Sequence, residues 1–194
     1  MEEAILNLVL EAFTVSLFSI ILAEFGDKTQ LGVITLAASH KKPRSIFLGM
    51  IAGYIVVAGL AVLVGQALLA ILPLSVLTSV SGLVFIAVGL LMLKVDVDNG
   101  VVGPRMRNPF LAASLMIILT EMGDKTQIMT VALAARFAQP VTVFAGVIAA
   151  FIIIDGASII LADRLGKRVP TGKVKRASAV IFIVLGILTI LGLF

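Results

Sequence analysis

The chain has 194 residues, of which 60% are hydrophobic and 13% are charged, and its mean hydropathy is +1.19. A soluble domain of this length would carry about twice that share of charged residues, so the composition excludes an ordinary soluble protein and indicates an integral membrane protein. The absence of cysteine excludes disulfides, thiolate metal sites and catalytic thiols. The net charge of +4 comes from basic residues between apolar runs, and we expect no nucleic-acid partner.

Six apolar runs are long enough to cross a bilayer, which takes about 20 residues. They cover residues 8–39, 45–72, 76–93, 109–136, 141–163 and 177–194. Prolines at or near the starts of most runs suit the first turns of helices, where no amide donor is needed. The sequence therefore predicts an all-α integral membrane protein with six transmembrane helices. The acidic start, Glu2 and Glu3, argues against a cleavable signal peptide.

The chain repeats itself with an offset of 97 residues. Aligning residues 13–97 with 110–194 needs no gap, and 27 of the 85 positions are identical, among them glycines, prolines and charged residues. We therefore expect one membrane domain built from two three-helix repeats, residues 1–97 and 98–194. Because three is odd, the second repeat enters the membrane from the opposite side, which makes this an inverted repeat.

The orientation follows from the basic residues in the connections. The first, third and fifth connections carry twelve Lys and Arg residues, whereas the second has none and the fourth has only Arg136. By the positive-inside rule we expect the basic connections in the cytoplasm and both termini outside it.

A charged motif lies inside the first and fourth apolar runs. It reads Glu24-Phe25-Gly26-Asp27-Lys28-Thr29-Gln30 in the first repeat and Glu121-Met122-Gly123-Asp124-Lys125-Thr126-Gln127 in the second. Each charge inside a bilayer costs about 2.5 to 3.5 kcal/mol on insertion scales and indicates a functional site. The structural alternative is an ion pair between residues i and i+4 of a helix, such as Glu24 and Lys28.

Two backbone geometries fit the motif. On a regular helix Glu24 and Asp27 share one face with Lys28 beside them, and Thr29 and Gln30 project elsewhere. If the helix opens near the motif glycine, threonine and glutamine can join the same site, as in transporters with broken helices. The sequence leaves both geometries open for both repeats.

Bringing the two motifs together gives four carboxylates and two ammonium groups, a net charge of −2. One divalent cation neutralises this charge, and so do two protons. Metal and protons therefore compete for the site, as exchange transport requires. Carboxylate, hydroxyl and amide oxygens suit hard cations such as Ca²⁺, Mg²⁺ and Mn²⁺.

One further acid lies inside an apolar run. Asp155, in the fifth run, aligns with Ala58 of the first repeat and so breaks the symmetry. It could carry protons or serve as an extra ligand, or it could be a protonated acid bonded to a neighbouring helix.

The doubled Glu-x-Gly-Asp-Lys-Thr motif in a duplicated six-helix chain resembles the Gdt family of membrane cation transporters. The resemblance covers nearly the whole chain. It implies a cation/proton antiporter for Mn²⁺ or Ca²⁺, closest to bacterial manganese exporters of the plasma (inner) membrane. The residues that it implies as metal ligands are Glu24, Asp27, Glu121 and Asp124, with Thr29 and Thr126 in support.

From the motif itself we add Gln30 and Gln127 to the candidate ligands. Lys28, Lys125 and Asp155 are candidates for proton or charge tuning. We expect a transported divalent ion and no resident cofactor, with the bilayer as partner, and a homo-oligomer is compatible with the sequence.

Two other classes of protein fit the motifs less well. An intramembrane aspartic protease has no need of lysines beside its acids, and a lipid pyrophosphate phosphatase needs Arg or Ser donors that the motifs lack. We therefore expect no enzymatic activity. A passive cation channel would share the acidic lining, but its flux would not follow a pH gradient.

Overall fold

The computed structural model describes residues 2–25, 29, 33, 36, 40, 42–94, 106–165 and 171–192. Within these ranges every regular element is a helix, which agrees with the all-α prediction. The helices are α1 (Glu2–Glu24), α3 (Pro43–Ile71), α4 (Leu74–Lys94), α5 (Pro109–Glu121), α6 (Lys125–Phe137), α7 (Pro140–Leu165) and α8 (Thr171–Ile190).

Three of the described helices contain stretches long and apolar enough to cross a membrane. These stretches are Ile5–Glu24 in α1, Pro43–Ile71 in α3 and Pro140–Ile160 in α7. Shorter apolar stretches lie in the remaining long helices and in α5, at Ser75–Leu90, Pro109–Glu121 and Ala179–Ile190. The chain is thus a helical protein with the lengths and hydropathy of a membrane protein.

The helix starts follow from local sequence. Pro43 occupies the first turn of α3 and Pro109 that of α5, where the missing amide hydrogen costs nothing. The side chain of Asn108 caps α5 by accepting hydrogen bonds from the amides of Phe110 and Leu111. These signals place the starts of α3 and α5 within a few residues of the starts of the predicted runs.

The fourth apolar run is broken at the motif. Helix α5 ends at Glu121 and α6 begins at Lys125, so the two helices replace a single one. Gly123, between them, has φ of 82°, a left-handed conformation that glycine adopts without strain. The regular-helix alternative is therefore wrong for the second motif.

The first motif is described only in part. Helix α1 ends at Glu24, the first residue of the motif, and Phe25 forms a turn. Thr29 is the next described residue. The candidate residues Asp27, Lys28 and Gln30 lie outside the described part of the chain.

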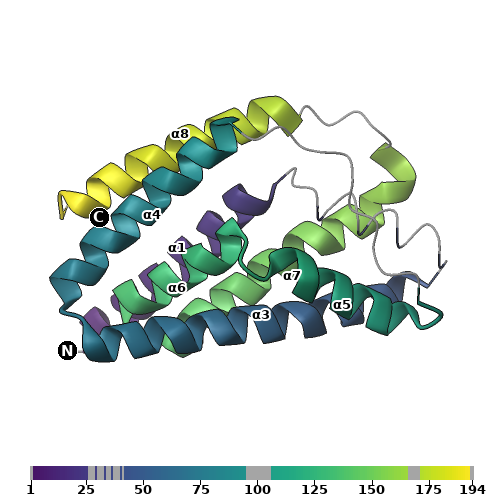
Figure 1. The fold of residues 1–194 in the computed structure, drawn as a ribbon, viewed down its shortest axis with the longest axis horizontal. Coiled ribbons are helices and arrows are strands. Elements are labelled where there is room, and N and C mark those ends of the chain that lie inside the picture. Colours follow the sequence, from purple (N-terminus) through teal and green to yellow (C-terminus); the bar gives the residue numbers. More distant parts are fainter. Residues whose placement is uncertain are drawn as a thin grey trace.

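The helices form a bundle with α6 near its middle. Helix α1 packs on α7, α3 packs on α5, α6 and α7, and α4 runs beside α8 (Figure 1). The two termini lie at the same end of the bundle, which also holds the start of α4 (Figure 1). The starts of α3, α5 and α8 lie at the opposite end (Figure 1). The second motif, at the break between α5 and α6, therefore lies between the two ends of the bundle.

Two close helix contacts recur at the 97-residue offset. Gly49 of α3 lies against the backbone carbonyl of Phe110 in α5, and Gly146 of α7 lies against that of Phe13 in α1. The 97-residue offset relates Gly49 to Gly146, and it relates Phe13 to Phe110. Small residues at these positions let the helix backbones approach closely.

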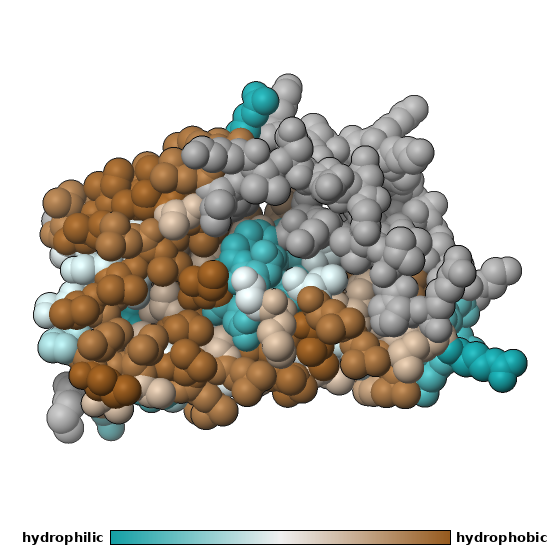
Figure 2. Space-filling view, in the orientation of Figure 1, coloured by the Kyte–Doolittle hydropathy of each residue, from teal (hydrophilic) through white to brown (hydrophobic). Residues whose placement is uncertain are grey.

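The surface is mostly apolar, with a hydrophilic patch in the middle of one face (Figure 2). Large side chains such as Leu63, Leu119 and Ile160 are more than half exposed. Such exposure of apolar side chains is expected where a surface faces lipid and is unusual where it faces water. The described motif residues that keep some polar surface are Asp124, Lys125 and Gln127.

Candidate cation-binding site

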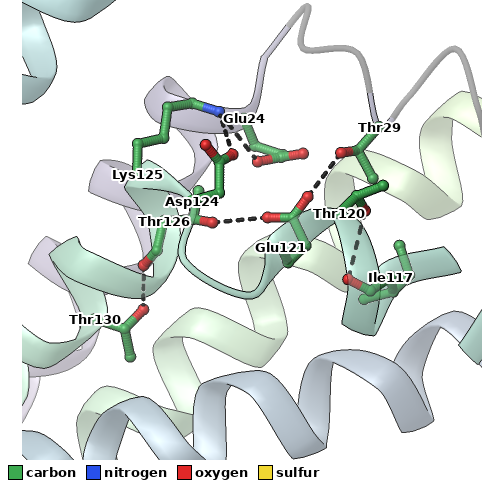
Figure 3. Close-up of polar contacts among 9 residues, drawn as sticks. All are labelled: Glu24, Thr29, Ile117, Thr120, Glu121, Asp124, Lys125, Thr126 and Thr130. Atoms are coloured by element: carbon green, nitrogen blue, oxygen red, sulfur yellow. Dashed lines mark hydrogen bonds and ion pairs between the residues drawn. The ribbon is translucent and has the colours of Figure 1, made fainter. Parts of the chain in front are cut away.

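The candidate site lies where α1 ends and where α5 gives way to α6. Glu24 ends α1 and Glu121 ends α5, and both side chains are 0% exposed. The break in the fourth run turns the start of α6 back toward Glu121 (Figure 3). The two repeats thus each place a buried glutamate at a helix end.

Glu121 is held by two threonine hydroxyls. Thr29 of the first repeat donates to one carboxylate oxygen over 2.7 Å, and Thr126 of the second donates to the other over 2.8 Å (Figure 3). Thr126 reaches Glu121 because the helix is broken by a turn between them. Both candidate threonines therefore meet at one carboxylate, and both are buried.

Glu24 is left without such support. Neither of its carboxylate oxygens has a hydrogen-bond partner, although the residue is fully buried. The ammonium of Lys125 lies 4.0 Å from one oxygen and contacts Asp124 more closely, at 3.2 Å (Figure 3). The buried acid of the first repeat thus faces a lysine from the second repeat.

The ion-pair alternative does not describe the second motif. A continuous helix would bring Lys125 to Glu121 at positions i and i+4, but the break directs Lys125 to Asp124 and Glu24 instead. The lysine therefore links the two repeats, and its side chain is 14% exposed.

Asp124 and Gln127 shape the break itself. Asp124 precedes the first residue of α6, and its amide donates to the carbonyl of Glu121 over 3.1 Å. The side-chain oxygen of Gln127 accepts a hydrogen bond from the amide of Gly123. Gln127 is thus turned toward the backbone of the break, while Asp124 keeps a carboxylate that is 24% exposed beside Lys125.

Asp155 approaches the same region from the middle of α7. It is 1% exposed, and neither carboxylate oxygen has a regular hydrogen-bond partner. Its charge acts on both Glu24 and Glu121. Both alternatives, a proton carrier or extra ligand and an acid bonded to a neighbouring helix, stay open, because the hydroxyl of Tyr54 in α3 lies beside Asp155.

Sequence reasoning missed Tyr54 of α3. Its hydroxyl is buried and lies near Asp155, although the two groups do not form a hydrogen bond of regular geometry. The hydroxyl also interacts electrostatically with Glu24 and Glu121. The available signal was that Tyr54 is the only tyrosine in the chain and lies inside an apolar run.

The site as described is a set of hard oxygen donors. Carboxylates come from α1, α5, α7 and the start of α6, and hydroxyls come from Thr29 and Thr126. Among the described residues, no three His, Cys, Asp or Glu side chains converge tightly enough to enclose a metal ion. Oxygen donors of this kind bind hard divalent cations, and the lysine lowers the negative charge when no cation is present.

A family model described as divalent cation/proton antiporter GDT1 matches residues 12–100 and again residues 109–194. The chain belongs to the GDT1 family. The two matches begin 97 residues apart and together cover most of the chain. A GDT1 protein is a divalent cation/proton antiporter and not an enzyme, so the expected activity class is confirmed.

The chain is also similar to a protein of Vibrio cholerae serotype O1 named "Putative manganese exporter". The two are 28% identical over 186 residues, which is 93% of this chain and 91% of the relative. No solved structure is significantly similar to the chain. The GDT1 match and this bacterial relative, together with the apolar helices, identify a membrane transporter of divalent cations.

Proposed function

We propose that the protein exports Mn²⁺ from the cytoplasm in exchange for protons. The observation that carries this proposal is the buried carboxylate of Glu24, which accepts no hydrogen bond and lies 4.0 Å from the ammonium of Lys125, in the same site as Glu121. A buried carboxylate without donors is costly unless a cation or a proton joins it. The manganese assignment is supported by the name of the bacterial relative.

Metal and protons compete for the same oxygens. The motif acids Glu24, Asp27, Glu121 and Asp124 are the proposed ligands, with Thr29, Thr126 and the two motif glutamines in support. Binding of Mn²⁺ needs the acids deprotonated, so a proton that binds one of them weakens the hold on the metal. Inward proton flow can in this way drive outward metal flow.

We further propose six membrane spans arranged as two inverted repeats, residues 1–97 and 98–194. Two observations support this architecture. The family model matches the chain twice, and the contact of Gly49 with Phe110 has its counterpart, at the 97-residue offset, in that of Gly146 with Phe13. An even number of spans also agrees with termini at one end of the bundle (Figure 1).

The orientation proposal places the protein in a bacterial plasma membrane with both termini outside the cytoplasm. Because the chain has no cysteine, single cysteines can be introduced without a background. A cysteine at Glu3 should react in intact cells with a thiol reagent that does not cross the membrane, and a cysteine at Arg107 should react only after lysis. The reverse labelling pattern would place the termini in the cytoplasm.

The transport proposal is tested with purified protein in liposomes. We expect an imposed pH gradient to drive Mn²⁺ against its own concentration gradient, and we expect protons to move in the opposite direction. Equilibrium binding should weaken as pH falls, because protons occupy the carboxylates. Mn²⁺, Ca²⁺ and Mg²⁺ are compared in the same liposomes to establish the cargo.

Three outcomes would change the proposal. Flux of Mn²⁺ only down its gradient, with no response to pH, would indicate a channel. Equal Mn²⁺ affinity at pH 5 and pH 8 would contradict proton competition. Faster exchange of Ca²⁺ than of Mn²⁺ under the same gradient would make calcium the main cargo.

A further inference from the structure

We propose that Asp155 and Tyr54 form, together with Glu24, a second position for the transported cation beside the one at Glu121. This inference rests on the proposed function and adds to it two residues that lie outside the repeated motif. It predicts that one half of the site binds the cation through groups that the other half lacks.

The first observation is the location of the unpartnered atoms. Within the described part of the chain, the buried side-chain oxygens without a hydrogen-bond partner belong to Ser16, Glu24, Tyr54 and Asp155. Three of these four residues, Glu24, Tyr54 and Asp155, lie close enough for their charges to act on one another, and the Tyr54 hydroxyl lies beside the Asp155 carboxylate. This one hydroxyl can satisfy at most one of the four carboxylate oxygens of Glu24 and Asp155. Buried polar groups in proteins are nearly always satisfied, so several unsatisfied oxygens at one place indicate a missing ligand.

The second observation is that packing fixes these groups in place. The ring of Tyr54 stacks on that of Phe151 with centroids 3.6 Å apart and an angle of 13° between the planes. Asp155 follows Phe151 by one helical turn and therefore lies on the same side of α7. Helix α1 packs along α7 where Gly146 lies against Phe13, which keeps Glu24 beside the same helix.

The third observation is that each of the two polar side chains, Asp155 and Tyr54, occurs in only one of the two repeats. Asp155 aligns with Ala58, and Tyr54 aligns with Phe151. The stacked pair Tyr54 and Phe151 is thus a pair of equivalent positions, one with a hydroxyl and one without. The asymmetry matches that of the glutamates, because Glu121 has two threonine partners and Glu24 has none.

The missing ligand has to carry positive charge. Glu24, Asp155, Glu121 and Asp124 are four carboxylates, and Lys125 is the ammonium that the structure shows among them. When all four acids are ionised, three negative charges remain. Two carboxylates and a phenolic oxygen are hard donors, so the fitting ligand is a divalent cation such as Mn²⁺ rather than a soft metal ion.

The test measures Mn²⁺ affinity of the purified full-length protein by equilibrium dialysis, and pH-driven Mn²⁺ transport in liposomes. Asp155→Asn keeps the size of the side chain and removes its charge. Tyr54→Phe keeps the stacked ring and removes only the hydroxyl. Ser158→Ala is the matched control, since Ser158 lies on the same helix and its hydroxyl bonds the Ile154 carbonyl.

We expect Asp155→Asn to weaken Mn²⁺ binding by about tenfold or more, as loss of one ligand charge in a buried site does. Tyr54→Phe should weaken it by a smaller factor, about threefold, as for the loss of one hydrogen-bonding or ligating oxygen. Asp155→Glu should retain most of the affinity, because it restores the carboxylate. Ser158→Ala should bind and transport as the unaltered protein does.

Unchanged affinity in both Asp155→Asn and Tyr54→Phe would overturn the inference and indicate that water fills the position. If Asp155→Asn fails to fold, Tyr54→Phe alone decides, because it preserves the packing. The proposed function fails separately, if the unaltered protein moves no Mn²⁺ in response to a pH gradient. Normal transport by the unaltered protein and by both variants would reject only the second position.

Discussion

Replacing Glu121 with glutamine is expected to abolish metal transport while leaving the protein folded. The substituted side chain would keep the shape and could still accept one threonine hydroxyl, but the site would lose one negative charge. A bound divalent cation would then lack a buried counter-charge, which costs about 3 kcal/mol or more, or a factor of about 100 in affinity. Glu24→Gln should have the same effect, because each repeat supplies one of the two buried glutamates.

The measurement is Mn²⁺ efflux and manganese tolerance in cells that express each variant at the same membrane level. Thr120→Val is the matched control, since Thr120 precedes Glu121 but its hydroxyl donates to the carbonyls of Met116 and Ile117 in its own helix. Figure 3 shows the second of these contacts. This control should export normally. Near-normal export by Glu121→Gln or by Glu24→Gln would remove that glutamate from the transport site.

Replacing Gly49 with alanine is expected to destabilise the bundle. The added methyl group would collide with the backbone carbonyl of Phe110, and a backbone atom cannot move aside as a side chain can. Overpacking of this kind costs about 1 to 3 kcal/mol. The change should also displace α5, which carries Glu121, because the hydroxyl of Ser114 bonds the carbonyl of Gly49 at this contact.

The control is Gly59→Ala in the same helix, where an added methyl group meets nothing within 4 Å. Thermal unfolding in detergent should show a lower midpoint for Gly49→Ala and an undiminished midpoint for Gly59→Ala. Gly146→Ala should resemble Gly49→Ala, since its methyl group would meet the carbonyl of Phe13. Equal midpoints for Gly49→Ala and Gly59→Ala would show that the close contact is not needed for stability.

Much of the fold could be predicted because its signals are local. Apolar runs and prolines indicated the starts of α3 and α5 to within a few residues, as Pro43 and Pro109 show, whereas the first run extends past the end of α1 at Glu24. The 97-residue offset predicted that both motif glutamates serve one site, and the structure buries both at helix ends. These features depend on composition and spacing, which a sequence contains directly.

The details of the site depend on whether the helix continues through the motif, and a glycine permits a break without requiring one. That single choice decides whether Lys125 meets Glu121 or Glu24, and whether Thr126 can reach Glu121. Tyr54 was missed because a tyrosine in an apolar run usually packs as an aromatic side chain. Its position near Asp155 depends on how α3 packs on α7, which no local pattern reveals.

The break between α5 and α6 also affects how the protein is made. Each of these helices has 13 residues, a length of about 20 Å, whereas the hydrocarbon core of a bilayer is about 30 Å thick. Neither half is long enough to cross by itself, so in the proposed six-span arrangement the two halves enter the membrane as one segment that contains Asp124 and Lys125. Their contact over 3.2 Å offsets one charge against the other and lowers the free energy of inserting that segment into lipid.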